Sequence, residues 1–418
     1  MQPTDAPATN DTATDVLTQP LGLPCGATLP GRIGKSAMSE QLGDRVNAPT
    51  SELHRLYRRW GATGAGLLIT GNVMVDRHHL GEPKNVVVDD ERHLPQLREW
   101  ASAAQANGTP TWVQINHPGR QALRIAGTHP VAPSPLRPKV PGAPTPKELT
   151  DGQIHAIIER FAVTAEVVRT AGFHGVQIHG AHGYLVSQFL SPRANERTDG
   201  WGGDATRRMR FVLEVLRAIR ARVGSGYPVG IKLNSADFQR GGFSEEESMD
   251  VVAALTAEGL DLLEISGGTY ESPAMTSGGG TTKAESTKRR EAYFLEYAEK
   301  VRAISAVPLM VTGGFRSAAG MRDAISSGAT DLAGLGRPFA LQVEVPRTVL
   351  DGGTAPDMGS RKPSSQQLQA ALELYFHTRQ IQRIGAGHEP QTAEPLPVTA
   401  AHMLLDNGWA ALRRKRGG

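Results

Sequence analysis

The stretch "VGIKLNSADFQRGGFSEEESMDVVAALTAEGLDLLEIS", from Val229 to Ser266, reads as a strand, a helix and a second strand. Its two ends are short apolar runs, and the segment "SEEESMDVVAALTAEG" between them has the spacing of an amphipathic helix. Ser244 and Glu247 have the spacing of a capping box, and Gly259 stands where the helix should end. The stretch therefore predicts one strand and helix unit followed by the next strand.

The same alternation of short apolar runs and longer amphipathic segments recurs along the chain. The predicted strands are 32–39, 66–72, 110–116, 175–179, 229–234, 262–266, 308–314 and 332–336. Eight strand and helix units fit a closed parallel (β/α)8 TIM barrel, in which functional groups gather beyond the carboxyl ends of the strands. An open doubly wound sheet would give the same local pattern, so periodicity alone leaves both folds open.

Composition limits the class of protein. The chain has 418 residues, and none of its apolar runs approaches the roughly 18 residues of a membrane span, so we expect a soluble protein with no membrane partner. Its 45 basic and 42 acidic side chains leave a formal charge of +3, and we expect no nucleic-acid partner. The single cysteine, Cys25, excludes an intrachain disulfide and a cysteine-rich metal or iron–sulfur site, which fits a cytoplasmic location.

Three regions are expected along the chain. Residues 1–16 lack the basic and apolar segments of a secretory signal and are expected to form a flexible tail. The barrel would span 17–360, with a Pro-rich excursion from His129 to Thr150 that cannot be helical. Residues 361–418 would form a C-terminal helical extension packing on the barrel, with an amphipathic helix over 364–385.

Two glycine turns, "TGGFRS" and "GLGRPF", end the seventh and eighth predicted strands. Barrels commonly hold phosphate there, because glycines let backbone N–H groups approach the anion and Arg316 or Arg337 adds charge. The alternative is two tight turns whose arginines form surface ion pairs. No Gly-x-Gly-x-x-Gly follows a strand, and "GKS" at Gly34 lacks the upstream glycine of a phosphate loop, so Rossmann and P-loop sites are excluded.

His179, His182 and Tyr184 follow the fourth predicted strand, in "GVQIHGAHGY". Two imidazoles there could donate hydrogen bonds to a ligand oxygen or bind a metal, and the phenol could supply a proton. A metal needs a third ligand, and no carboxylate accompanies the pair, so a donor pair is favoured and no metal ligand is assigned. Gln114 suits the edge of a heterocycle or could cap a strand, and Lys232 is either a buried cation or an ion-pair partner at the barrel rim.

The segment "HGAHGYLVSQFLSPRANERTDGWGG" resembles the signature segment of the old yellow enzyme family, the FMN-dependent NADH:flavin oxidoreductases. The resemblance extends from Leu17 to Phe339, with "VQINHPGR", "VTGGFRS" and "DLAGLGRP" in the family's order. It implies a barrel that binds FMN at the carboxyl ends of its strands, with NADH or NADPH as hydride donor. The implied FMN-binding residues are Ala37, Met38, Ser39, Asn72, Gln114, Lys232, Gly313, Gly314, Phe315, Arg316, Gly336 and Arg337.

The resemblance also implies a reaction. Hydride would pass from NAD(P)H through flavin N5 to the β-carbon of an activated alkene, an enone, enal or nitroalkene. His179 and His182 would bind the acceptor oxygen, and Tyr184 would protonate the α-carbon. The partner is then a small molecule, while a homo-oligomer is left open.

Several positions depart from better-known members of the family. Ser39 stands where Thr or Cys is usual, Gly71 where an acidic residue is frequent, Lys232 where Arg is common, and Asn116 where an aromatic residue is frequent. These differences should affect redox potential and substrate shape more than reaction class. Two alternatives remain: a TIM-barrel metal-dependent hydrolase using His179 and His182, and a flavin-binding protein without turnover.

Overall fold

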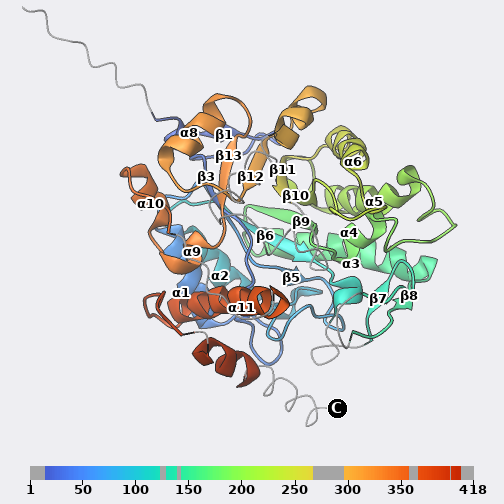
Figure 1. Cartoon of the computed structure of the whole chain (residues 1–418), viewed down its shortest axis with the longest axis horizontal. Coiled ribbons are helices and arrows are strands. Elements are labelled where there is room, and N and C mark those ends of the chain that lie inside the picture. Colours follow the sequence, from blue (N-terminus) through green and yellow to red (C-terminus); the bar gives the residue numbers. More distant parts are fainter. Residues whose placement is uncertain are drawn as a thin grey trace, which may run out of the picture.

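The computed structural model describes residues 15–122, 129–138, 143–266, 296–356, 366–395 and 397–405, and shows a closed barrel of parallel strands surrounded by helices (Figure 1). The predicted (β/α)8 barrel is confirmed. Each strand pairs in parallel with the next, and the last pairs with the first to close the ring. The barrel strands are β3 (Ile33–Lys35), β4 (Leu67–Ile69), β6 (Thr111–Asn116), β9 (Gly175–Gly180), β10 (Val229–Asn234), β11 (Leu262–Ser266), β12 (Leu309–Thr312) and β13 (Leu332–Leu335).

Each strand lies at its predicted run, but three are clearly shorter than predicted: β4 ends at Ile69 rather than at 72, β12 ends at Thr312 rather than at 314, and β3 ends at Lys35 rather than at 39. β10 and β11 begin and end as predicted. β3 is shorter than its predicted run, because its pairing with both neighbouring strands ends at Lys35 and the ladder continues only through the bond from Ser36 N to Leu335 O. The residues that follow Ser36 are therefore part of the loop at the barrel mouth rather than of the wall.

Helices form the outer ring, and the start predicted for the helix after Ser244 is confirmed. The Ser244 hydroxyl accepts the N–H of Glu247, whose carboxylate accepts the N–H of Ser244, so the capping box of α6 is complete. The Ser317 hydroxyl accepts the N–H of Gly320 and so caps the start of α8. The ring helices are α1 (Ser51–Gly61), α2 (Leu94–Gln105), α3 (Asp151–Thr170), α5 (Ala205–Val223), α6 (Glu245–Ala257), 296–304 and α8 (Ala318–Ser326).

Shorter elements complete the connections between strands and ring helices. They are the helices α4 (Leu185–Leu190), α9 (Pro338–Leu341) and α10 (Val345–Leu350), and the 3₁₀ turns η1 (Val16–Thr18), η2 (Glu91–His93) and η3 (Gly119–Gln121). In addition, β5 (Val73–Met74) pairs in parallel with the upper part of β6.

The interior of the barrel is apolar at the end where the strands begin. Inward-facing side chains fill it there: Leu67, Ile69, Trp112, Leu262, Met310 and Leu332. A hairpin of β1 (Leu21–Gly22) and β2 (Thr28–Leu29) packs Leu21, Leu23 and Leu29 against this layer and closes the barrel from below. Because this end is filled, the carboxyl ends of the strands are the place for a ligand.

Segments outside the barrel lie over its rim and side. The described parts of the Pro-rich excursion contain no helix, as predicted, and β7 (Val131–Ala132) pairs in parallel with β8 (Lys147–Glu148). The predicted helix over 364–385 is α11 (Gln366–Gly385), which packs on α1 (Figure 1). Arg55 of α1 donates to the carbonyl of Gly385. A further helical segment covers 397–405. Among the helices described, none combines the length and apolarity of a membrane span.

Candidate active site

Polar side chains replace the apolar filling in the upper half of the barrel. Because side chains alternate along a strand, residues two positions after the apolar layer also point inward. They form a polar layer of Ser36, Gln114, Gln177, Lys232, Glu264 and Thr312, all buried except Thr312. Gln114 and Lys232 were predicted as site residues, and both lie in this layer.

Glu264 is the centre of the polar layer. Its Oε1 accepts hydrogen bonds from Ser36 Oγ, from Lys232 Nζ at 2.9 Å and from Thr312 Oγ1 at 2.7 Å. Its Oε2 accepts from Gln177 Nε2 at 2.8 Å. Burial by itself would raise the pKa of Glu264, but the Lys232 ammonium and these hydrogen bonds bring it below its ordinary value. Lys232 therefore has an ion-pair partner, inside the barrel rather than at its rim.

His179, His182 and Tyr184 lie together, as predicted. The His179 and Tyr184 rings lie 4.7 Å apart between centroids, and those of His179 and His182 lie 5.1 Å apart. The two imidazoles are hydrogen-bonded to each other, from His179 Nε2 to His182 Nδ1 at 3.0 Å, and His182 Nε2 lies 2.9 Å from Ser266 Oγ. A ligand oxygen that takes both imidazoles as donors must therefore replace these two contacts.

Both imidazoles are neutral near pH 7, because burial lowers the pKa of His179 far below its usual range and that of His182 to about 3. In the described part of the chain, His179 Nδ1 is buried without a hydrogen-bond partner. Since an unpaired buried N–H is rarer than an unpaired acceptor, we assign the His179 proton to Nε2, which donates to His182. His182 then donates from Nε2 to Ser266, so each ring offers one Nε2–H.

The turn that carries these side chains is held by amides from neighbouring loops. His182 has a positive φ of 62°, which an L-residue adopts only when its surroundings hold it. Asn234 Oδ1 accepts its N–H at 3.3 Å, and Gln121 Nε2 donates to its carbonyl at 2.8 Å. Gln188 Nε2 donates to the Gly183 carbonyl at 2.7 Å. The backbone conformation before Tyr184 therefore depends on three side-chain amides.

The loop after β3 carries Ala37, Met38 and Ser39, all partly exposed. The Ser39 hydroxyl donates to the carboxylate of Glu82, whose pKa is raised by burial. Asn72, the other predicted residue on this side, is also partly exposed and follows β4.

The structure leaves no room for an acidic side chain at position 71. The N–H of Gly71 donates to Glu40 Oε1 at 2.7 Å, and a Cβ on Gly71 would lie 2.0 Å from Glu40 Oε2. The carboxylate of Glu40, from the loop after β3, thus fills the space that a side chain at position 71 would need.

The two glycine turns lie side by side at the ends of β12 and β13, whose residues Thr312 and Gly334 are paired. Gly313 and Gly314 have φ of 113° and 89°, values that glycine adopts without strain. The backbone N–H groups of Gly314, Gly336 and Arg337 donate to no acceptor in the described ranges. Phe315 is buried beneath this turn, while Arg316 is partly exposed and Arg337 exposed. N–H groups with no acceptor in the described ranges, on two turns that each carry an arginine, suit a phosphate.

These features fit FMN. The phosphate would be held by the glycine turns with Arg316 and Arg337, and the isoalloxazine ring would lie over the polar layer beside Ala37, Met38 and Ser39. Gln114 Oε1 receives no hydrogen bond from any residue in the described ranges, so it is available to the pyrimidine edge.

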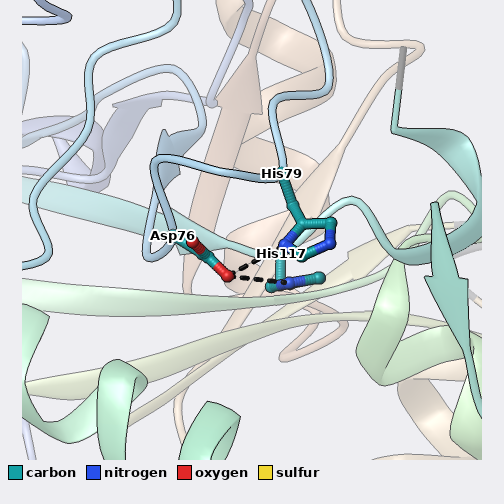
Figure 2. Close-up of side chains that lie close together, drawn as sticks. All are labelled: Asp76, His79 and His117. Carbon is teal, nitrogen blue, oxygen red and sulfur yellow. Dashed lines mark hydrogen bonds and ion pairs between the residues drawn. The ribbon is translucent and has the colours of Figure 1, made fainter. Parts of the chain in front are cut away.

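A separate cluster brings Asp76, His79 and His117 together, with ligand atoms close enough for a metal ion (Figure 2). Asp76 Oδ2 lies 2.9 Å from His79 Nδ1 and 3.9 Å from His117 Nε2. However, His117 Nδ1 accepts the N–H of Gly119, so the proton of the neutral ring is on Nε2, the atom that a metal would need. Burial lowers the pKa of His117 to about 3, which keeps the ring neutral. The contact that joins the loop after β5 to the turn after β6 is the one between the His79 and His117 rings, whose centroids lie 4.9 Å apart.

Several site residues were missed in the sequence: Gln177, Asn234, Glu264 and Ser266, with Glu40 and Glu82 from loops. The first four lie on strands at inward positions, so their alternation with apolar residues was a usable signal. The two glutamates had none. Glu40 meets its partners, on α1 and after β4, and Glu82 meets Ser39, in the loop after β3, only when the chain folds.

Comparison with known proteins shows the family of the chain. The model of the "NADH:flavin oxidoreductase / NADH oxidase family" matches residues 17–353. The "NADH-dependent flavin oxidoreductase iliE" of Hypocrea jecorina (strain QM6a) is 38% identical over 356 residues, which are 79% of this chain and 88% of that protein. The "NADH oxidase" of Thermoanaerobacter brockii is 33% identical over 77% of this chain and 48% of its own length.

Solved structures share the fold. The old yellow enzyme homologue from Zymomonas mobilis superposes with a TM-score of 0.70 at 21% identity, covering 84% of this chain and 98% of that one. Morphinone reductase gives a TM-score of 0.70 at 22% identity, covering 86% and 97%. The chain thus belongs to the NADH:flavin oxidoreductase / NADH oxidase family, the old yellow enzyme family, and is an oxidoreductase that uses FMN and NAD(P)H.

Proposed function

We propose that this protein is an ene-reductase, which reduces the C=C bond of small activated alkenes at the expense of NADH or NADPH. The observation that carries the proposal is the grouping of two neutral imidazole donors and one phenol at the barrel mouth, above the polar layer. An enone, enal or nitroalkene has a carbonyl or nitro group on which negative charge develops and one carbon that needs a proton, which matches these groups.

FMN, when bound, would supply the hydride chemistry that links the nicotinamide to the β-carbon of the alkene. Gln114 would hold the pyrimidine edge, and Lys232 would stand near N1 and O2. Gly313, Gly314, Phe315, Arg316, Gly336 and Arg337 would hold the phosphate, with Ala37, Met38, Ser39 and Asn72 along the ring. The N–H groups of the glycine turns and the Oε1 of Gln114, which have no partner among the described residues, support this placement.

His179 and His182 would bind the carbonyl or nitro oxygen of the substrate. That oxygen would receive the Nε2–H of each ring in place of His182 Nδ1 and Ser266 Oγ. Fixed neutral donors stabilise the charge that develops on the oxygen when hydride arrives, as in an oxyanion hole. Because both rings stay neutral well below pH 7, this donation does not vary with pH in the physiological range.

Tyr184 would deliver the proton to the α-carbon, which completes the addition of one hydride and one proton. Its ring is buried against His179 at the start of α4, so the hydroxyl is held near the oxygen-binding pair.

The test is an absorbance spectrum of the purified protein under anaerobic titration. We expect a flavin spectrum that NADH bleaches and 2-cyclohexenone restores; NADH is used first because the relatives' names specify it. A bleached flavin that cyclohexenone and nitroalkenes leave reduced would refute the proposal and favour a flavin-binding protein without turnover. Stoichiometric zinc without flavin would favour a hydrolase built on His179 and His182.

A further inference from the structure

A chain of side-chain hydrogen bonds crosses the polar layer from β11 to β6. Gln177 Nε2 donates to Glu264 Oε2 at 2.8 Å, and Gln114 Nε2 donates to Gln177 Oε1 at 2.8 Å. All three residues are buried, with exposures of 0% for Gln177 and Glu264 and 2% for Gln114. Each group therefore has only its neighbours as partners, and the direction of each bond is constrained by the next.

Glu264 sets that direction because an ionised carboxylate can only accept hydrogen bonds. Its Oε1 already accepts from Lys232, Ser36 and Thr312, and Lys232 is its ion-pair partner. Gln177 must then turn its NH₂ group toward Glu264, which leaves its Oε1 facing Gln114. Gln114 must in turn give one N–H to Gln177.

We infer that Glu264 is a positioning residue for FMN, which acts through Gln177 to fix the orientation of the Gln114 amide so that Oε1 remains as the acceptor for the ligand. Such an edge selects a ligand N–H flanked by carbonyl oxygens, which is the imide of the flavin pyrimidine ring. The inference rests on the proposed placement of FMN over Gln114. It assigns to Glu264 a role besides the neutralisation of Lys232.

The isosteric variant Glu264→Gln tests this direction. Lys232, Ser36 and Thr312 would keep the amide oxygen on their side, so the new NH₂ would face Gln177. Gln177 would then reverse, Gln114 would reverse after it, and an NH₂ would meet the imide N–H. We expect the Kd of FMN, measured by fluorescence titration of the apoprotein, to rise by about tenfold to a hundredfold, the range for one mismatched buried hydrogen bond.

Gln177→Leu breaks the hydrogen-bond chain without reversing the direction of its bonds. The Gln114 amide is then free to adopt the orientation that the ligand requires. We expect a rise in the FMN Kd of no more than about fivefold. The double variant should bind FMN as Gln177→Leu does, so the second substitution rescues the first. A double variant as weak as Glu264→Gln would overturn the inference, because loss of the carboxylate charge or of packing would then be the cause.

Riboflavin provides a matched control, because it lacks the phosphate. Glu264→Gln should raise the Kd of riboflavin and the Kd of FMN by the same factor. A change confined to the Kd of FMN would contradict an effect at the flavin ring. If Glu264→Gln fails to fold by circular dichroism, wild-type protein with ¹⁵N-labelled FMN answers the same question. A sharp, slowly exchanging N3–H that Gln114→Met abolishes supports the inference, and a rapidly exchanging N3–H in the wild type overturns it.

These outcomes separate the inference from the proposed function. A wild-type protein that binds FMN and fails to reduce alkenes would refute the ene-reductase proposal and leave the orientation of Gln114 untouched. Normal alkene reduction by the wild type together with unchanged FMN affinity in Glu264→Gln would overturn the inference about Gln114 and leave the ene-reductase proposal standing.

Discussion

Replacing Tyr184 by Phe removes one hydroxyl and should separate the two half-reactions of the enzyme. The ring contact with His179, 4.7 Å between centroids, does not need the hydroxyl, so the free energy of unfolding should fall by only about 1 kcal/mol. The proton donor is lost, however, and with 4% of Tyr184 exposed, water has little access to take its place. General acid catalysis contributes about 10²- to 10⁴-fold, so alkene reduction should slow by that factor, which is about 3 to 5 kcal/mol of activation free energy.

Anaerobic stopped-flow absorbance measures both steps on one sample. Bleaching of the flavin by NADH should keep its wild-type rate in Tyr184→Phe, because hydride transfer from the nicotinamide needs no proton from the phenol. Reoxidation by 2-cyclohexenone should slow. The matched control is reoxidation by ferricyanide, which has no carbon to protonate and should proceed at the wild-type rate.

The opposite pattern would refute the role of Tyr184. If bleaching by NADH collapsed while reoxidation by cyclohexenone stayed normal, the phenol would belong to nicotinamide binding. If ferricyanide and cyclohexenone were slowed equally, the variant would have disturbed the flavin site rather than proton delivery.

Three further predictions concern other parts of the molecule. Arg337→Gln should weaken FMN about tenfold and leave riboflavin unchanged, because its guanidinium would act on the phosphate alone; equal weakening would remove it from that site. Gln188→Met should lower the free energy of unfolding in urea by about 2 to 4 kcal/mol, since its buried amide bonds to two carbonyls and one N–H, and a loss under about 1 kcal/mol would contradict this role. Burial lowers the pKa of Lys35 from 10.5 to about 8, although Glu40 and Glu264 oppose the shift. Below pH 8 the Lys35 proton is bound in both the folded and the unfolded state. Between pH 8 and 10.5 the folded state has lost this proton while the unfolded state still binds it. The free energy of unfolding should therefore increase by about 3 kcal/mol as the pH rises across that window. Urea unfolding of Lys35→Met should lack this rise, and an identical rise in both proteins would contradict the burial of a charged ammonium.

Much of the architecture could be predicted because it depends on local pattern. The strands at 229–234 and 262–266 and the capping box of Ser244 are set by residues within one turn or one strand of each other. The hairpin that closes the bottom of the barrel was not predicted, since its strands have two residues each and their role is visible only where Leu21, Leu23 and Leu29 meet the barrel filling.

The sequence by itself determined the order of strands and helices, the ends of the strands where the site lies, and the residues His179, His182 and Tyr184 that share one turn. The tertiary structure decided their partners: the bond between the two imidazoles, the Glu82 contact of Ser39, the carboxylate of Glu40 against Gly71, and the chain from Glu264 to Gln114. The physical reason is the separation along the sequence of the residues that interact. Periodicity and capping act between residues a few positions apart, whereas the hydrogen bonds of the polar layer join residues 63 and 87 positions apart, which meet only when the barrel closes.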